Sequence, residues 1–395
     1  MRICFLSPLI PSVAYGHRPY SFITELSALR HEITLHCLDD SGPAVGAKSH
    51  LESIGAEVRP VGIARTKRWS NCLLGLPSRT PLRVLHCQSG KLLDRLIQDV
   101  RENDYDVVHV DRFRLAPYGM KIREEFKGPV VIDFPDALSL YYERAVKNPR
   151  HFLKKWIDLR EHRVTPGYER KVLSSGLSSV VCSNLDRDFL LKHAPESSIE
   201  VIPNMVDTEE FKPRSRQSDQ PRGAFTGTLY YLPNIDGLLW LKEEVMPLLG
   251  DVDLPIDVIG YGATSELDSL EEDRRFKMVG YVENMADHLF QEDIYLCPLR
   301  VGAGIRFKLL EAFAAGMAAV STTLGYEGIP CQPGEHLLVA DTPAEFAAAI
   351  RHLASHPEER KRIGENARRF VVENFSSKAT GKQLESLYQD LLASG

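Results

Sequence analysis

The sequence predicts an α/β protein of two domains, each with a parallel sheet flanked by helices. Short apolar segments typical of buried strands alternate with amphipathic helical segments along the chain. Loops that contain glycine follow strands at matching places in the two halves. Between the halves, residues 212–223 read KPRSRQSDQPRG, a polar stretch with the composition of a linker. A chain of 395 residues also has the length for two domains of about 150 to 200 residues each.

The composition excludes several classes of protein. An apolar fraction of 43% and a charged fraction of 26% are those of a soluble globular chain. No apolar run reaches the roughly 18 residues that span a bilayer, and the opening MRICFLSPLI is typical of a first strand rather than of a signal peptide. We therefore expect a cytoplasmic protein. The net charge of −6 argues against nucleic acid as the main partner.

No metal site is expected from the cysteines and histidines. The seven cysteines are scattered and odd in number, which favours small buried thiols over disulfides or a thiolate cluster. The thirteen histidines show none of the paired spacings that hold zinc on a helix.

The first half is expected to open with a strand, a glycine loop, a helix and a second strand. Its expected elements are a strand at 2–6, a helix at about 21–29, strands at 31–38 and 57–61, a helix at about 89–102, strands at 105–110 and 129–133, a helical region at 149–174, a strand at 178–183 and a helix at 184–194. Ligand sites of open α/β sheets gather where such strands end.

Three residues near these strand ends are candidates for chemistry. Gly16 would let the backbone approach a phosphate or an acceptor closely, although a simple turn glycine fits the sequence as well. Asp136 follows the strand at 129–133 and would orient or deprotonate an acceptor hydroxyl, or else cap the next helix. His109 lies near the end of its strand, where a structural role is the alternative to catalysis.

The most informative stretch runs from Leu296 to Gly328 and predicts a strand, a glycine loop, a helix and another strand. The helix is expected to begin near Ile305 and to end at Gly316. Gly302 and Gly304 lie in the loop before it. A glycine loop that runs into a helix presents unpaired N–H groups and a positive dipole end, which suit a diphosphate.

Charged residues at the start of this helix indicate an anion site followed by a site for hydroxyl groups. Arg306 and Lys308 place two positive charges where a helix normally carries acids. Glu311, one turn further on, would accept hydrogen bonds from ribose or sugar hydroxyls. This is the layout of a nucleotide-sugar pocket. The alternative is an ordinary crossover helix on which Lys308 and Glu311 form an exposed i,i+3 pair.

Two further glycine loops belong to the second half. Gly227 and Thr228 follow a strand that begins at Ala224, and a helix starts near Pro233 or Asn234. Gly260 follows the strand in PIDVIGYGATSE. That segment lacks the third glycine of a dinucleotide fingerprint, so a dehydrogenase is not predicted.

The segment PLRVGAGIRFKLLEAFAAGMAAVSTTLGYEGI resembles the donor-binding segment of family-4 retaining glycosyltransferases, which have the GT-B fold. The common family pattern has two glutamates eight positions apart; Glu311 matches the second, and Ala303 stands at the first. Many members with a Gly-x-Gly-x-Arg/Lys-x-Lys loop, as in GAGIRFK here, also lack the first glutamate. IEVIPNMVDTEEF resembles the segment that ends the first domain of the family. The loop GTLYYLPNIDG lacks the Arg and Lys that usually hold the diphosphate.

The resemblance implies two Rossmann-like α/β domains that face a central cleft. An acceptor-binding domain is expected at 1–205 and a nucleotide-sugar donor-binding domain at 206–375. A final helix at 376–395 is expected to cross back onto the first domain. Residues 278–282 would neighbour the base of the nucleotide.

The implied activity is transfer of a sugar, with retention, from a nucleotide-diphosphate donor and without a metal or other cofactor. Arg306 and Lys308 would stabilise the leaving diphosphate, and Asp136 would serve the acceptor. The implied donor-binding residues are Gly16, Gly227, Thr228, Asn234, Gly260, Val282, Gly302, Gly304, Ile305 and Glu311.

The variant loops look most like those of transferases from bacterial exopolysaccharide assembly, including the type that accompanies exosortase (PEP-CTERM) sorting systems. The acceptor would then be a glycan or a lipid-linked oligosaccharide. Residues 58–93 contain no acid but seven basic residues, with Trp69 and several leucines among them. Such a segment suits peripheral contact with the anionic inner face of the cell membrane, or else a solvated surface.

Two alternative functions stay open at this point. One is a nucleotide-sugar epimerase or hydrolase of the same fold, which would need well-placed carboxylates and histidines such as Asp136 and His109. The other is a non-catalytic nucleotide-sugar-binding partner subunit, which the missing first glutamate and the missing basic residues of the second loop would suit.

Overall fold

The computed structural model describes residues 1–12, 16–39, 46–147, 152–213, 220–250, 252–302 and 304–394. Ala303, the position of the first family glutamate, lies outside these ranges. The chain forms two compact units, one of Met1–Pro203 together with Thr380–Gly395, and one of Asn204–Ala379. The predicted limits, 1–205 with 376–395 and 206–375, differ from these by a few residues.

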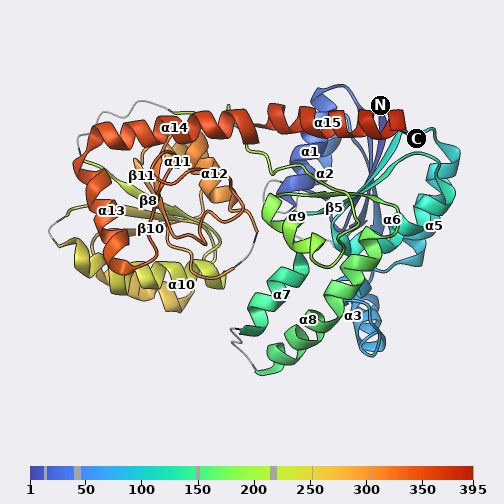
Figure 1. Cartoon of the computed structure of the whole chain (residues 1–395), viewed down its shortest axis with the longest axis horizontal. Helices are drawn as coiled ribbons and strands as arrows, with labels where there is room; N and C mark the ends of the chain where they lie inside the picture. The colour runs from blue at the N-terminus through green and yellow to red at the C-terminus, as the bar shows by residue number, and fades with distance from the viewer. Residues whose placement is uncertain are drawn as a thin grey trace. The chain divides into compact units, whose positions relative to one another are not determined.

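The first unit is built on a seven-stranded parallel sheet with the order β3-β2-β1-β4-β5-β6-β7 (Figure 1). Its strands are β1 (Arg2–Ser7), β2 (Glu32–Asp39), β3 (Glu57–Gly62), β4 (Val107–Asp111), β5 (Val130–Phe134), β6 (Ser178–Val181) and β7 (Ile199–Val201). The order of strands reverses between β1 and β4, which lie side by side. In sheets of this kind, ligands bind beyond the carboxyl ends of the strands at this switch point.

Helices cover both faces of this sheet. They are α1 (His17–Ala28), α2 (Ala47–Ser53), α3 (Arg65–Leu74), α4 (Leu82–Leu85), α5 (Gly90–Glu102), η1 (Phe113–Leu115), α6 (Ala116–Glu125), α7 (Leu138–Lys147), α8 (Phe152–Leu173), α9 (Asn184–Leu191) and, from Thr380 onward, α15 (Ser377–Ser394). Helix α1 begins directly after Gly16, earlier than the predicted start at residue 21.

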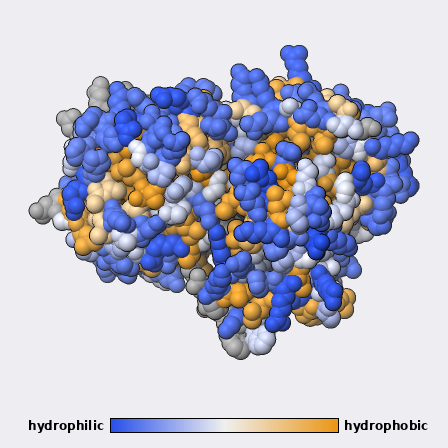
Figure 2. Space-filling view, in the orientation of Figure 1, coloured by the Kyte–Doolittle hydropathy of each residue, from blue (hydrophilic) through white to orange (hydrophobic). Residues whose placement is uncertain are grey.

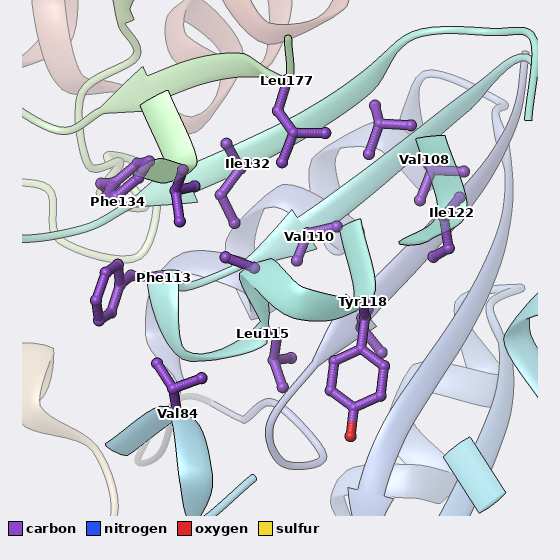
Figure 3. Packing of buried hydrophobic residues seen from close by; sticks show 14 of the residues in the cluster. Val84, Val108, Val110, Phe113, Leu115, Tyr118, Ile122, Ile132, Phe134 and Leu177 are labelled. Atoms are coloured by element: carbon purple, nitrogen blue, oxygen red, sulfur yellow. The ribbon is translucent and has the colours of Figure 1, made fainter. Parts of the chain in front are cut away.

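The core of the first unit follows the alternation of side chains along its strands. Val108 and Val110 of β4 pack with Ile132 of β5 and with Leu115 and Ile122 from η1 and α6 (Figure 3). Because successive strand residues point to opposite faces, His109 lies on the other side of the sheet.

His109 is part of that other face rather than of an open site. It is fully buried and stacks on Phe5 at a centroid distance of 4.6 Å. Its Nδ1 lies 2.7 Å from the hydroxyl of Tyr388, which α15 contributes. Burial lowers the pKa of His109 to about 4, so the ring is neutral at physiological pH. The structural interpretation of His109 therefore fits better than the catalytic one.

The second unit has a six-stranded parallel sheet with the order β10-β9-β8-β11-β12-β13 (Figure 1). Its strands are β8 (Gly223–Thr226), β9 (Ile256–Ile259), β10 (Phe276–Gly280), β11 (Ile294–Cys297), β12 (Ala318–Ser321) and β13 (Leu338–Val339). Its helices are α10 (Leu232–Trp240), η2 (Leu241–Val245), η3 (Met246–Leu249), η4 (Ser265–Glu272), α11 (Met285–Leu289), α12 (Phe307–Ala314), α13 (Pro343–Ser355) and α14 (Pro357–Phe375).

The strand order of the second unit repeats that of the first. Here the switch point lies between β8 and β11, which are neighbours in the sheet. Both units are thus doubly wound α/β sheets of the predicted class. Among the helices of the described ranges, none has both the length and the apolar character needed to cross a bilayer.

A buried ion pair joins α1 to β5 in the first unit. The Arg18 guanidinium donates from Nε and Nη2 to the two carboxylate oxygens of Asp133, at 2.7 and 3.0 Å. Both side chains are almost fully buried. The Arg18 guanidinium also lies 4.5 Å from the ring centroid of Phe22. The Asp133 carboxylate therefore anchors α1 to β5 through Arg18.

We expect Asp133→Ala to lower the free energy of unfolding by about 3–5 kcal/mol, because it leaves the Arg18 charge buried without a partner. The double change Arg18→Met with Asp133→Leu should cost much less, since it removes both charges. Urea unfolding of the full chain measures both effects. Arg101→Ala, which breaks an exposed pair with Glu125, serves as a control and should cost less than about 1 kcal/mol. Equal losses in the single and double variants would contradict this account.

Candidate functional site

The loop between β11 and α12 positions the charged residues that the sequence singled out. Gly302 and Gly304 have φ angles of 123° and 85°, which favour glycine. The helix begins at Phe307, two residues later than the predicted Ile305, because Arg306 is extended and occupies the N-cap position. The Arg306 Nη1 donates to the carbonyl of Gly304 at 2.7 Å. The Arg306 side chain thus lies before the first turn and steadies the glycine loop.

The end of α12 matches the sequence prediction. The helix closes at Ala314, and Gly316 follows with a φ of 76°. The N–H of Gly316 donates to the carbonyl of Phe313, and that of Met317 to the carbonyl of Ala312. This is the hydrogen-bond pattern of a glycine-terminated helix.

Lys308, in the first turn of α12, reaches a residue from a different loop. Its Nζ donates to the Oδ1 of Asn234 at 2.7 Å, and it lies 4.2 Å from the ring centroid of Phe225. Burial lowers the pKa of Lys308 to about 8. Among the described residues, no ion pair joins Lys308 to Glu311. The alternative of an exposed i,i+3 pair is therefore not what the structure shows.

Gly227 makes this contact sterically possible. A Cβ at this position would lie 2.6 Å from the Nδ2 of Asn234 and 2.8 Å from the Nζ of Lys308. Asn234 also donates from Nδ2 to the carbonyl of Thr228 at 2.8 Å. The loop after β8 and the start of α12 consequently meet at Gly227, Thr228, Asn234 and Lys308.

Gly260, after β9, supports this loop from beside it. A Cβ there would lie 1.8 Å from the carbonyl oxygen of Gly227, so only glycine permits the two backbones to pack. Val282 lies beyond the end of β10 and is half-buried. The contacts of Gly260 are thus explained by backbone packing, and whether either residue meets a donor stays a prediction.

Glu311 lies one turn further along α12 than Lys308. Burial raises its pKa to about 7, and the charge of Glu210 adds to this shift. Within the described ranges, no hydrogen bond to its carboxyl group is found. Ile305, by contrast, is buried and serves packing. A carboxyl group whose pKa is raised in this way, near the half-buried ammonium of Lys308, is typical of a ligand site.

These residues gather at the switch point of the second sheet. Gly227 and Thr228 directly follow β8, and the loop that carries Arg306 and Lys308 follows β11. Because β8 and β11 are adjacent and parallel, their carboxyl ends meet at one edge. The arrangement offers two cations, the amino end of a helix and one carboxyl group, which suits an anion with attached hydroxyl groups.

The candidates of the first unit are arranged differently. Gly16 has a φ of 75° and is the N-cap of α1, as a turn glycine would be. Asp136 is half-buried in the loop after β5. Helix α7 begins at Leu138, two residues after Asp136, and a helix-capping role for Asp136 stays a prediction. An acceptor role for Asp136 stays a prediction.

Some features of the two sites carry no recognisable sequence signal. The partner of Lys308 is 74 positions away in the chain, and helical spacing alone pointed to Glu311 instead. Asp111 and Arg112, which end β4 in the first unit, were not singled out at all. The position of Asp111 at the end of an apolar strand was the one available hint.

Comparison with known families agrees with this architecture. Residues 18–210 match the family model described as Glycosyltransferase Family 4, and residues 220–356 match the model described as Glycosyl transferases group 1. The two matches together span most of the chain. The chain belongs to the family-4 glycosyltransferases.

Curated relatives of this glycosyltransferase share part of its length. An uncharacterized 44.6 kDa protein in the cps region of Klebsiella pneumoniae is 28% identical over 176 residues, covering 42% of this chain and 45% of that protein. A phosphatidyl-myo-inositol mannosyltransferase from Mycobacterium tuberculosis is 26% identical over 266 residues, covering 62% and 63%. The chain spans about half the length of the first curated relatives that it matches.

Solved structures show the same fold over the full chain. A sucrose-phosphate synthase from Thermosynechococcus elongatus superposes with a TM-score of 0.72 at 15% identity and covers 100% of both chains. HepE from Anabaena, solved with UDP and glucose, gives a TM-score of 0.68 at 15% identity, covering 99% of this chain and 100% of its own. These likenesses establish the GT-B fold of the glycosyltransferase.

The raised pKa of Glu311 predicts a dependence of stability on pH. Its pKa is about 7 in the folded protein against an ordinary value of 4.5. The folded state therefore binds the proton more tightly, and stability is lost as the pH rises from about 4.5 to about 7. Glu311→Gln removes this loss. We expect the variant to be more stable than the parent at pH 8, by roughly 1–2 kcal/mol after allowance for solvent screening, and nearly equal at pH 4.5.

Urea unfolding at the two pH values measures this difference. Glu335→Gln, at an exposed glutamate of the same unit, is the matched control. A Glu311→Gln variant that is less stable than the parent at pH 8 would show that the carboxylate is stabilised rather than strained there.

Proposed function

We propose that the protein is a retaining glycosyltransferase whose nucleoside-diphosphate-sugar donor binds at the carboxyl ends of β8 and β11. The observation that carries this proposal is the convergence of Lys308, Asn234 and Gly227 beside the amino end of α12. The half-buried Lys308 ammonium is held by a neutral amide and has no carboxylate ion-pair partner among the described residues. A diphosphate would supply the missing negative charge.

The chemistry follows from the charges around this point. Departure of the nucleotide leaves negative charge on the diphosphate, and Arg306, Lys308 and the helix amino end would stabilise it as it develops. Because these two side chains supply positive charge at the leaving group, the reaction is proposed to proceed without a bound metal. Glu311 is proposed to accept hydrogen bonds from donor hydroxyls and so to position the sugar.

The acceptor is proposed to bind to the first unit, with Asp136 near its hydroxyl group. The loops GTLYYLPNIDG and GAGIRFKLLEA resemble those of exopolysaccharide transferases. A glycan or lipid-linked oligosaccharide of bacterial cell-surface polysaccharide synthesis is the proposed acceptor. The association with exosortase systems stays a prediction from that resemblance.

An exposed apolar surface on the first unit supports a lipid-linked acceptor. We call it the α3–α8 surface; its apolar members are Trp69, Leu73, Leu74, Leu76, Trp156 and Ile157, all of which are exposed. Arg160 of α8 ties the two parts together, because its guanidinium donates to the carbonyls of Leu76 and Thr80. Figure 2 shows apolar residues exposed in the region where Figure 1 places α3 and α8.

Basic side chains surround this surface. Arg65, Lys67, Arg79 and Lys155 are exposed, and no acid occurs between residues 58 and 93. Aromatic and aliphatic side chains bordered by basic ones suit the interface of an anionic bilayer. We therefore propose that the protein binds peripherally to the cytoplasmic face of the cell membrane through the α3–α8 surface.

Thermal stabilisation by nucleotide sugars tests the donor site. Among UDP-, GDP-, ADP-, TDP- and CMP-linked sugars, one nucleoside diphosphate should raise the melting temperature. Ligand at about 100 times its Kd adds roughly 2.7 kcal/mol of stability. Lys308→Met and Arg306→Gln should each remove most of the shift, whereas Arg351→Gln, on the surface of α13, should keep it.

The outcomes separate the three candidate functions. Donor binding with transfer to an added glycan supports the proposal. Turnover of the donor without any acceptor would instead indicate an epimerase or hydrolase, and binding without turnover on any acceptor would indicate a partner subunit. No stabilisation by any member of the panel would refute the donor site itself.

Vesicle sedimentation tests the α3–α8 surface. Binding to phosphatidylcholine vesicles that contain phosphatidylglycerol should fall at least several-fold in the double variant Trp69→Ser with Trp156→Ser, because both rings lose their burial in the interface. Tyr281→Ser removes an equally exposed aromatic ring from the second unit and should leave binding unchanged. If both variants sediment like the parent protein, the surface does not bind lipid.

A further inference from the structure

The carboxyl end of β4 in the first unit holds a strained backbone at its switch point. Arg112 follows β4 with φ 70° and ψ 135°, a conformation that residues other than glycine rarely adopt. Nearby side chains and the packed helix after it must hold this conformation in place. Strained residues of this kind cluster at ligand sites.

Asp111, the last residue of β4, has one carboxylate oxygen that accepts no hydrogen bond from the described residues. Its side chain is 1% exposed, and its Oδ2 accepts a hydrogen bond from the Ser7 hydroxyl at 3.1 Å. The Arg112 Nε lies 3.5 Å from the same oxygen. Its Oδ1 has no hydrogen-bond partner among the described residues. Burial raises the pKa of this carboxyl group. A buried carboxyl oxygen without a donor could accept a hydrogen bond from a ligand hydroxyl.

Two more guanidinium groups accompany Arg112. Helix α4, which carries Arg83, packs against η1, which carries Arg114; Figure 3 shows Val84 close to Leu115 at this contact. Arg83 lies over the ring of Tyr141 at 5.4 Å. Arg114 is half-buried, and no carboxylate of the described ranges forms an ion pair with Arg83 or Arg114. Burial, with Arg112 and Arg83 nearby, lowers the pKa of Arg114.

The acids of this region do not balance these charges. Glu161 forms an ion pair with Arg160 and accepts a hydrogen bond from the N–H of Leu82. Its carboxylate therefore already has partners other than Arg83, Arg112 and Arg114. Asp133 lies opposite Asp111 in the β4–β5 register and is paired with Arg18. The Asp111 carboxyl group itself lies near the guanidinium groups of Arg112 and Arg114, and Arg83 lies near Arg114. The carboxyl ends of β1 and β4 therefore carry a surplus of positive charge next to one free hydrogen-bond acceptor.

We propose that Arg83, Arg112 and Arg114 form a subsite for an anionic group on the acceptor, with Asp111 accepting a hydrogen bond from a sugar hydroxyl beside that group. This inference rests on the proposed transferase function and specifies its acceptor. The shared chemistry is an oxyanion attached to a sugar, either a phosphate or a carboxylate, because guanidinium groups bind both through paired hydrogen bonds.

Calorimetric titration of the full chain with glucose 1-phosphate, glucuronate and glucose tests the subsite. The titrations use the background Arg306→Gln with Lys308→Met, so that anions do not occupy the second unit. We expect glucose 1-phosphate or glucuronate to bind and neutral glucose to bind at least about tenfold more weakly, since it makes no charge-assisted hydrogen bonds. Binding of the phosphate alone assigns a phosphorylated acceptor, and binding of the carboxylate alone assigns a sugar acid.

Substitutions then assign the binding to these residues. Arg114→Gln and Arg112→Gly should each weaken the anionic ligand about tenfold or more. Arg112→Gly is suited to this test because glycine accepts the backbone conformation without strain, so the fold should survive. Arg101→Gln, an exposed arginine of α5, should have no effect.

Failure here is distinguishable from failure of the donor site. If neither anionic sugar binds, or if Arg114→Gln and Arg112→Gly bind the anionic sugar as tightly as the protein that keeps both arginines, the acceptor subsite is wrong even when a nucleoside diphosphate still stabilises the parent protein. If anionic sugars bind the parent protein and lose all affinity in the Arg306 and Lys308 background, they occupy the second unit and the inference is likewise overturned.

Discussion

The hydrogen bond between Lys308 and Asn234 is the constraint on which the candidate donor site depends. It joins the loop after β8 to the first turn of α12, and it exists because Gly227 has no side chain to keep the two apart. Gly260 in turn lets the backbone of that loop settle against β9. Because Gly227 and Gly260 have no side chains, Lys308 can pack into a partly desolvated position. That desolvation lowers the pKa of the Lys308 ammonium to about 8.

The two units use the same strand order but different chemistry at their switch points. In the second unit, the polar groups are an ammonium held by an amide and a carboxyl group whose pKa is raised to about 7 by burial. In the first, a buried carboxyl group and three arginines surround a strained turn, while the Arg18–Asp133 pair beside them is fully satisfied. Ion pairs whose hydrogen bonds are all made hold helices and strands together. Polar groups that lack a hydrogen-bond partner mark places where a ligand would supply one. This contrast supports a donor on one unit and an anionic acceptor on the other.

The strands of both sheets could be predicted well from the sequence, because buried parallel strands are encoded by short apolar runs between glycine loops. The sequence also located Arg306, Lys308 and Glu311, since a glycine loop leading into a helix has a recognisable composition. It placed the start of α12 two residues early, because the extended backbone of Arg306 is stabilised by its own contact with Gly304. It could not reveal the Lys308–Asn234 contact, which joins residues far apart in the chain, or the strain at Arg112, which no residue pattern encodes. The role of Asp136 stays a prediction, since the start of α7 at Leu138 does not by itself decide between helix capping and acceptor binding.

The measurement that tests the central claim most directly is a crystal structure of the protein with the stabilising nucleoside diphosphate. The account predicts that the diphosphate lies at the amino end of α12, that the Nζ of Lys308 contacts a phosphate oxygen, and that the base lies toward the loop after β10. It would be contradicted by a nucleotide bound away from the ends of β8 and β11, or by a diphosphate that touches neither Lys308 nor Arg306.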